Sequence, residues 1–108
     1  MVSNSTRMDL VFSALGDATR RALLTRLKRG ESTVGALASP FNVSRPAISK
    51  HLRVLEHAGL IRCARDGRVS RCGLNAAALR EAAAWVEEYR VFWEGKLGAL
   101  ASFVEQEP

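Results

Sequence analysis

The sequence predicts a mainly α-helical single domain that carries one small β-hairpin. Apolar residues recur at helical spacing through most of the 108 residues. The pair Asp66-Gly67 is typical of a two-residue hairpin turn and lies between segments that suit β-strands. Helical spacing then returns from Asn75 to about Val104. We therefore expect several short helices, a hairpin and one long final helix.

Two helices are expected first. The first runs from about Arg7 to Leu15, or from residue 6 at the earliest, because Thr6 and Asp9 have capping-box-like spacing and Gly16 follows. Asp17 then caps a second helix, from Ala18 to about Lys28, with its leucines facing inward. The exposed side of this second helix is basic and consists of Arg20, Arg21, Arg26 and Lys28.

A helix-turn-helix follows. Ser32 or Thr33 opens a short third helix, with an optional short strand before it, and Pro40 ends that helix. Residues 39–43 then form the turn into a fourth helix that runs from Ser44 to Gly59. Two short helices joined by a tight turn define this motif.

The fourth helix has the composition of a DNA recognition helix. Ser44 is a favourable N-cap, and Pro46 falls in the first turn, where a missing N–H costs little. Small hydroxyls can enter a groove, while Lys and Arg meet phosphates or guanine edges. An ordinary amphipathic surface helix is the alternative. We predict groove or base contacts from Ser44, Arg45, Pro46, Ser49 and Lys50, and phosphate contacts from Arg53.

The hairpin is basic. Taking Arg65 and Arg68 as the pair that flanks the turn places Arg62 opposite Arg71, and like charges at facing positions destabilise a ladder. The sequence therefore indicates a use for positive charge here, and we predict phosphate contacts from Arg65, Arg68 and Arg71. A solvated edge hairpin that resists aggregation is the alternative.

The hairpin also carries both cysteines of the chain, Cys63 and Cys72. In the same register they lie at diagonal positions, with Cα atoms roughly 7–8 Å apart. That separation is at the outer limit for a disulfide, so we expect two reduced thiols that pack the hairpin onto the core. A thiol-redox switch is the alternative.

The last helix, residues 75–104, is expected to start at an Asn75 cap and to carry two apolar stripes. A chain of this size has too little remaining core to cover both stripes, so a second copy is the expected partner. Gly95 and Gly98 are expected to weaken or kink the helix. With the N-terminal helix, it would form a homodimer interface through Leu10, Trp85, Tyr89, Phe92, Trp93, Leu100 and Phe103.

Charge and composition narrow the function. Net charge is +5, and residues 18–72 hold twelve Lys and Arg against three acids, which points to a polyanion partner. No nucleophile elbow, phosphate loop or metal-ligand cluster is found, so we expect no enzyme activity, cofactor or metal site. Neither a membrane-spanning run nor a signal-peptide pattern is present, so a cytoplasmic location is expected.

Four segments together carry a resemblance over nearly the whole chain: SRPAISKHLRVLEHAGLI, ALGDATRRALLTRL, RDGRVSRCGLN and the W-x₃-Y-x₂-F-W pattern of the last helix. The chain resembles the ArsR/SmtB family of bacterial winged-helix repressors. The resemblance implies a dimeric repressor that binds double-stranded DNA at an inverted repeat in its own promoter and leaves it when an effector binds. Neither metal site of that family is present, because ESTVGALAS lacks cysteine and residues 75–108 lack histidine.

The sequence thus predicts a homodimeric, autoregulating transcriptional repressor with a winged helix-turn-helix fold. A winged helix used only for protein interaction, and a repressor that senses thiol oxidation through Cys63 and Cys72, are the alternatives. The operator, the effector and the regulated genes are not predicted.

Overall fold

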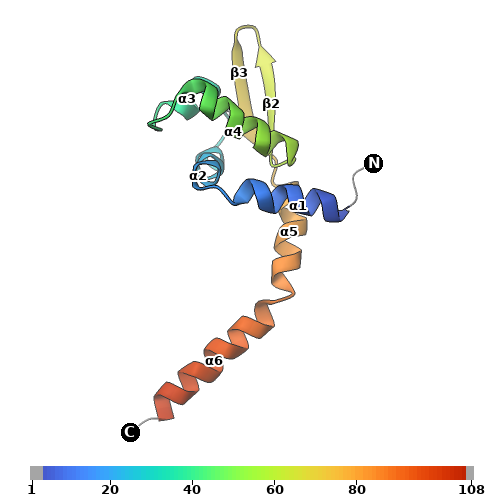
Figure 1. The fold of residues 1–108 in the computed structure, drawn as a ribbon, viewed down its shortest axis with the longest axis vertical. Coiled ribbons are helices and arrows are strands. Elements are labelled where there is room, and N and C mark those ends of the chain that lie inside the picture. The colour runs from blue at the N-terminus through green and yellow to red at the C-terminus, as the bar shows by residue number, and fades with distance from the viewer. Residues whose placement is uncertain (1–3, 107–108) are drawn as a thin grey trace.

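The computed structural model describes residues 4–106, which form six helices and three strands (Figure 1). The described elements are α1 (Asn4–Leu15), α2 (Ala18–Leu27), β1 (Ser32–Thr33), α3 (Val34–Ala38), α4 (Arg45–His57), β2 (Ile61–Asp66), β3 (Val69–Leu74), α5 (Ala77–Glu87) and α6 (Arg90–Gln106). The predicted class, mainly helical with a small β-hairpin wing, is confirmed. Helix α1 begins earlier than predicted, so Thr6 and Asp9 lie inside it and do not form a capping box.

One core holds α1 to α4 against the base of the sheet. Leu23 and Leu27 of α2, Leu37 of α3, and Ile48 and Leu55 of α4 are all buried. The predicted caps confirm why the helices begin where they do, since Asp17 accepts a hydrogen bond from the N–H of Arg20 and Thr33 from that of Ala36. The buried core therefore fixes the position of α4 within the helix-turn-helix.

The sheet has the order β1-β3-β2, with both pairings antiparallel. Its register differs from the predicted one. Asp66 pairs with Val69, so the turn consists of Gly67 and Arg68, and Gly67 has a φ of +64°. The predicted pairing of Arg62 with Arg71 is wrong, because Arg62 faces Gly73 and Arg71 faces Ala64. This register separates the like charges that the predicted register would have placed opposite each other.

The C-terminal region is two helices and not the single predicted one. Helix α5 ends at Glu87 and α6 begins at Arg90, while α6 runs without interruption through Gly95 and Gly98. The predicted cap is also wrong. The amide of Asn75 donates instead to the carbonyl of Gly59, at 2.8 Å, and Ala76 occupies the N-cap position with no side-chain bond.

The molecule is elongated, because α6 extends away from the compact body (Figure 1). The described chain measures 67 × 37 × 21 Å, and its radius of gyration is 18.4 Å, against about 13 Å for a compact domain of this length. Within residues 4–106, no helix is long and apolar enough to cross a membrane.

Candidate nucleic-acid interface

Helix α4 is fixed at both ends and along its inner face. Its N-terminus is capped by Ser44, whose hydroxyl accepts a hydrogen bond from the N–H of Ala47 at 3.2 Å. At the other end Gly59 has a φ of +79°, and the N–H of Leu60 reaches back to the carbonyl of Leu55 at 3.0 Å. The predicted start and stop of the helix are both confirmed.

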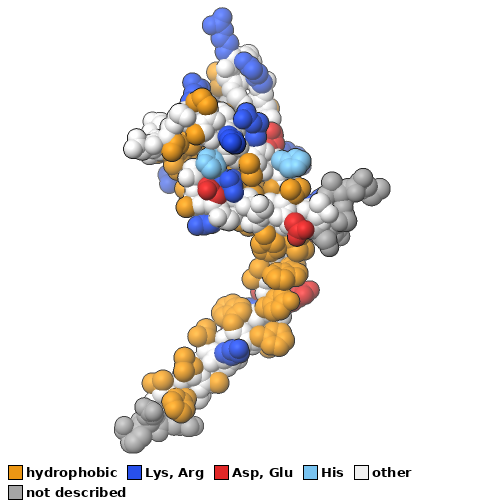
Figure 2. Space-filling model, in the orientation of Figure 1, with side chains coloured by type: hydrophobic (Ala, Val, Ile, Leu, Met, Phe, Trp, Pro, Cys, Tyr) orange, Lys and Arg blue, Asp and Glu red, His pale blue; other side chains and the backbone are white. Residues whose placement is uncertain are grey.

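The outward face of α4 is polar and cationic. Arg45, Pro46, Lys50 and Arg53 are exposed, and Ser49 is half-buried between them. Figure 2 shows basic side chains gathered over this part of the molecule. The structure thus leaves every predicted recognition-helix residue accessible, with no competing use for Lys50 or Arg53 among the ion pairs of residues 4–106.

Arg45 lies across the neighbouring helix α3. A methyl group placed on Gly35 would lie 3.2 Å from a terminal guanidinium nitrogen of Arg45. Glycine at this position therefore leaves room for the Arg45 side chain between the two helices of the motif.

Two arginines of the basic α2 surface form hydrogen bonds with backbone carbonyls of the same chain. Arg20 donates to the carbonyls of Ala14 and Ser13, at 2.7 and 3.1 Å, and Arg21 donates to the carbonyl of Leu15 at 2.7 Å. These carbonyls end α1 and lack partners within the helix. Arg20 and Arg21 thus close the end of α1, and the sequence alone did not reveal this role.

Behind α4, Asp17 forms a small electrostatic cluster with Arg20 and His51. The hydrogen bond from the backbone N–H of Arg20 lowers the pKa of the Asp17 carboxyl. Desolvation raises this pKa, and the nearby charges of Arg20 and His51 lower it further, so that the net shift is downward. Nδ1 of His51 lies 3.7 Å from the carboxylate and 3.3 Å from the Arg20 guanidinium. This cluster joins α2 to the rear of α4.

The wing presents its arginines at three different places. Arg68 lies in the turn, and Arg65 shares a face of the hairpin with Ser70, whereas Arg71 lies on the opposite face beside Ala64. All three are exposed, and Nε of Arg65 donates to the carbonyl of Gly67 at 3.3 Å. The wing is therefore a basic projection, although the predicted argument from facing arginines does not hold.

The two cysteines lie directly opposite each other and form a disulfide, so the predicted diagonal placement of reduced thiols is wrong. Their Cα atoms are 4.1 Å apart. A small cavity of about 160 Å³ adjoins them, and its lining includes Ser49 and Arg53 of α4. The N–H of Cys63 also donates to the carboxylate of Glu56 at 3.0 Å. The disulfide thus lies beside α4.

The residues predicted for the dimer interface remain uncovered by the protomer, apart from half-buried Leu10. Phe12 of α1 stacks edge-on with Trp85, and Tyr89 continues this row of aromatic rings to Phe92. Both predicted apolar stripes of α6 are exposed, and Phe92 has 68% of its surface accessible. The row of rings begins on α1, so α1 and the C-terminal helices present one continuous apolar surface.

Comparisons with known proteins agree with this geometry. Residues 15–64 match a family model described as a helix-turn-helix domain. The transcriptional repressor SdpR of Bacillus subtilis is 40% identical over 79 residues, which cover 73% of this chain and 88% of the repressor. The crystal structure of an ArsR family transcriptional regulator superposes with a TM-score of 0.78 at 39% identity, covering 87% of this chain and 97% of that one.

The chain belongs to the ArsR/SmtB family. A more distant solved structure is the homodimeric winged helix-turn-helix DNA-binding domain from Mycobacterium bovis, which is 23% identical with a TM-score of 0.64 and shares the fold. The superposed region covers 82% of this chain and 83% of that domain.

No group of three or more His, Cys, Asp or Glu that could hold a metal ion occurs in the described part of the chain. The predicted residues of the recognition helix and the wing lie on α4 and the hairpin, whereas the predicted dimer residues other than Leu10 lie within the C-terminal region, residues 77–106.

Proposed function

We propose that the protein is a homodimeric transcriptional repressor that binds an inverted-repeat DNA operator, including one in its own promoter. The observation that carries this proposal is the face of α4, which is cationic and exposed while its opposite face is locked into the core. A helix held this way keeps its side chains in register with base edges.

The contacts divide into two kinds. Ser44, Arg45, Ser49 and Lys50, with the slim Pro46 beside them, lie toward the N-terminal half of α4 and are suited to base edges. Phosphate contacts are assigned to Arg53 and to the wing residues Arg65, Arg68 and Arg71. In a two-fold dimer, two α4 helices would enter successive major grooves about 34 Å apart.

The test is fluorescence anisotropy on a duplex from upstream of the protein's own coding sequence, beside a scrambled duplex of equal length. The expected result is a preference of about 1,000-fold or more for the upstream duplex, with a steep salt dependence. Equal binding to both duplexes would contradict sequence-specific repression from that site. Loss of all binding at low salt would favour the alternative, a protein-interaction module.

A second candidate adds redox control to the same activity, because Cys63 and Cys72 are directly paired behind Ser49 and Arg53. We propose that the reduced dithiol exchanges with a small disulfide such as oxidised glutathione. The two thiols lose two protons and two electrons to form the Cys63–Cys72 bond, and the small disulfide is reduced to two thiols. Oxidation would then change how the wing sits against α4.

This candidate is tested by measuring operator affinity in excess reduced and excess oxidised glutathione. The affinity of the wild type is expected to differ at least threefold between the two conditions, whereas the Cys63→Ser Cys72→Ser variant, which removes both thiols, is expected to show no difference. Equal affinities for the wild type would contradict redox control.

A further inference from the structure

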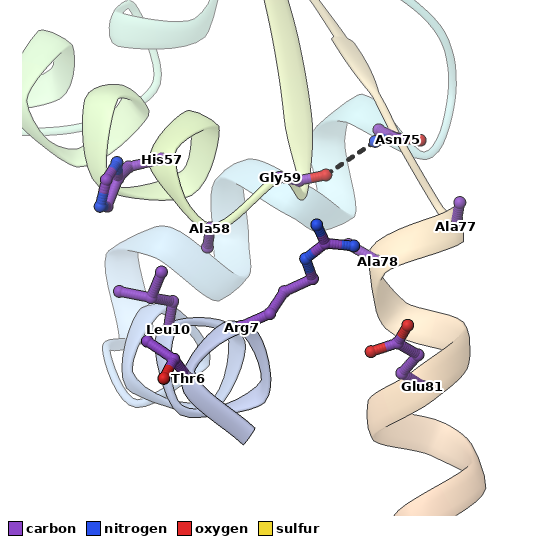
Figure 3. Close-up of a pocket in the computed structure, with 10 residues that line it drawn as sticks. All are labelled: Thr6, Arg7, Leu10, His57, Ala58, Gly59, Asn75, Ala77, Ala78 and Glu81. Carbon is purple, nitrogen blue, oxygen red and sulfur yellow. Dashed lines mark hydrogen bonds between the residues drawn. The ribbon is translucent and has the colours of Figure 1, made fainter. Parts of the chain in front are cut away.

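A groove on the side of the molecule away from the wing is lined by three elements (Figure 3). Its walls come from α1, from the segment that ends α4, and from the start of α5, and its volume is about 620 Å³. This volume falls within the range of small-molecule sites, about 300–1,000 Å³. The groove lies beside the C-terminal end of α4, where Ala58 and Gly59 follow the helix.

Two opposite charges line this groove on different helices. Arg7 of α1 extends toward Gly59 and Ala78, and Glu81 projects from α5 (Figure 3). The structure shows no ion pair or hydrogen bond for either side chain with any residue in 4–106. Arg7 and Glu81 are therefore free to bind a ligand, although each would be a natural partner for the other.

The rest of the lining is mixed, since Thr6, His57 and Asn75 are polar and the other side chains are small or apolar. Leu10, Ala58, Ala77 and Ala78 contribute only hydrocarbon side chains. Ala58 is buried, and Leu10 is half-buried. An apolar ligand group of moderate size could lie on these four side chains.

We propose that this groove binds a small zwitterion, a molecule of amino-acid or short-peptide size that carries a carboxylate, an ammonium group and an apolar side chain. A simple carboxylate would pair with Arg7 but be repelled by Glu81, and a simple amine would meet the reverse situation. A neutral molecule would leave both charges unpaired. The zwitterion alone matches both, with its carboxylate on the Arg7 guanidinium and its ammonium group on the Glu81 carboxylate.

Binding here would reach the recognition helix through short connections. Ala58 and Gly59 end α4 and line the groove, and Asn75 also lines it while donating to the Gly59 carbonyl at 2.8 Å. A ligand that draws α1 and α5 together would move this joint. The groove is therefore an effector site for the proposed repressor, and this part of the inference depends on the proposed function.

The first experiment uses isothermal titration calorimetry on the full-length chain with three probes. L-Leucine carries both charges, N-acetyl-L-leucine only the carboxylate, and L-leucinamide only the ammonium group. Leucine is expected to bind at least tenfold more tightly than either blocked form, because each lost charge removes one charge-assisted contact. No measurable leucine binding, or equal binding of all three probes, would overturn the proposal.

Variants then locate the site. Arg7→Gln and Glu81→Gln are each expected to weaken leucine binding about tenfold or more. Arg80→Gln is the matched control, since Arg80 is exposed on α5 but does not line the groove, and it should bind leucine like the wild type. An Arg7→Gln variant that folds normally and keeps full leucine affinity would place the ligand elsewhere and overturn the assignment.

The final measurement separates the ligand site from the function. Operator affinity is measured with and without saturating leucine, and a change of at least threefold is expected in the wild type but not in Arg7→Gln. If leucine binds but operator affinity is unchanged, the effector role is overturned while the site stands. If no DNA binding occurs without leucine or with it, the proposed function fails, and calorimetry still decides the site.

Discussion

Ser44 caps α4 and is proposed to contact DNA, and different substitutions can separate these two roles. Its hydroxyl caps α4, and it stands at the end of the helix that is assigned to base contacts. Ser44→Ala should lower the free energy of unfolding by about 1 kcal/mol, because the N–H of Ala47 loses its partner. Ser44→Asp should keep that stability, since Asp is an equally good cap, but should weaken operator binding by placing a negative charge against DNA.

Urea unfolding and anisotropy measure the two effects separately. Ser13→Ala is the control for stability, because Ser13 is exposed and its hydroxyl makes no hydrogen bond described for residues 4–106. A Ser44→Asp variant that binds DNA as tightly as the wild type would remove Ser44 from the interface.

Asp17 gives the protein an acid-sensitive contact. Its pKa is lowered in the folded state, first by the N–H of Arg20, so the ionised carboxylate stabilises the fold. That stability is fully present above the unfolded pKa of about 3.9 and is lost as the pH falls through the lower folded value. Asp17→Asn should cap the helix without titrating. The thermal midpoint of Asp17→Asn should therefore fall less than that of the wild type below about pH 4. If the thermal midpoints of the two proteins fall equally as the pH is lowered, the stabilising role of the Asp17 carboxylate is contradicted.

Arg68, at the tip of the wing, provides a test of phosphate binding. Arg68→Ala should weaken binding to operator and scrambled DNA by similar factors and reduce the slope of log affinity against log salt by about one unit. Arg80→Ala removes the same charge from an exposed position on α5, away from the recognition helix and the wing, and should leave the slope unchanged. An unchanged slope for Arg68→Ala would mean that the wing does not touch the DNA backbone.

Among the elements, helices with strong local signals were predicted well, and junctions were not. Ser44 and Gly59 mark the ends of α4 in the sequence, and both act there as expected. The break at 88–89 contains neither glycine nor proline, so the sequence carries no signal for it. The predicted register of the hairpin was wrong for a different reason. Taking Asp66 and Gly67 as the turn, in place of Gly67 and Arg68, shifted the partner of each strand residue by two positions, so that Cys63 was predicted to face Ser70 and not Cys72.

The glycines of α6 allow a test at the scale of this element. Gly95 and Gly98 have no atom within 4 Å of where a Cβ would lie, and the helix is continuous through both. Gly95→Ala Gly98→Ala should therefore increase helicity, with each substitution favouring the helix by up to about 1 kcal/mol. Circular dichroism and thermal melting measure the effect. A lower melting temperature would indicate that a partner approaches α6 closely at these positions.

At the scale of the whole molecule, the two ends have opposite chemistry. One end consists of α4 and the wing and is basic, while the other is an aromatic and aliphatic helix that contacts little of its own chain (Figure 2). Apolar side chains such as Phe103, with 60% of its surface accessible, would be unfavourable in water on a monomer. Their exposure could be anticipated from the two apolar stripes, because the helices before residue 60 already supply most of the core.

The last prediction follows from this arrangement. Phe92→Glu Leu100→Glu places charges on the apolar surface of α6 and should convert a dimer into a monomer of 11.8 kDa, as measured by sedimentation. Because each monomer would then bind one half-site, operator affinity should fall by about 100-fold or more. Lys96→Glu is the control on the same helix, because it adds an acid at a polar position. If the double variant still sediments as a dimer, the interface lies elsewhere. If it is monomeric but binds the operator with full affinity, repression does not require two recognition helices.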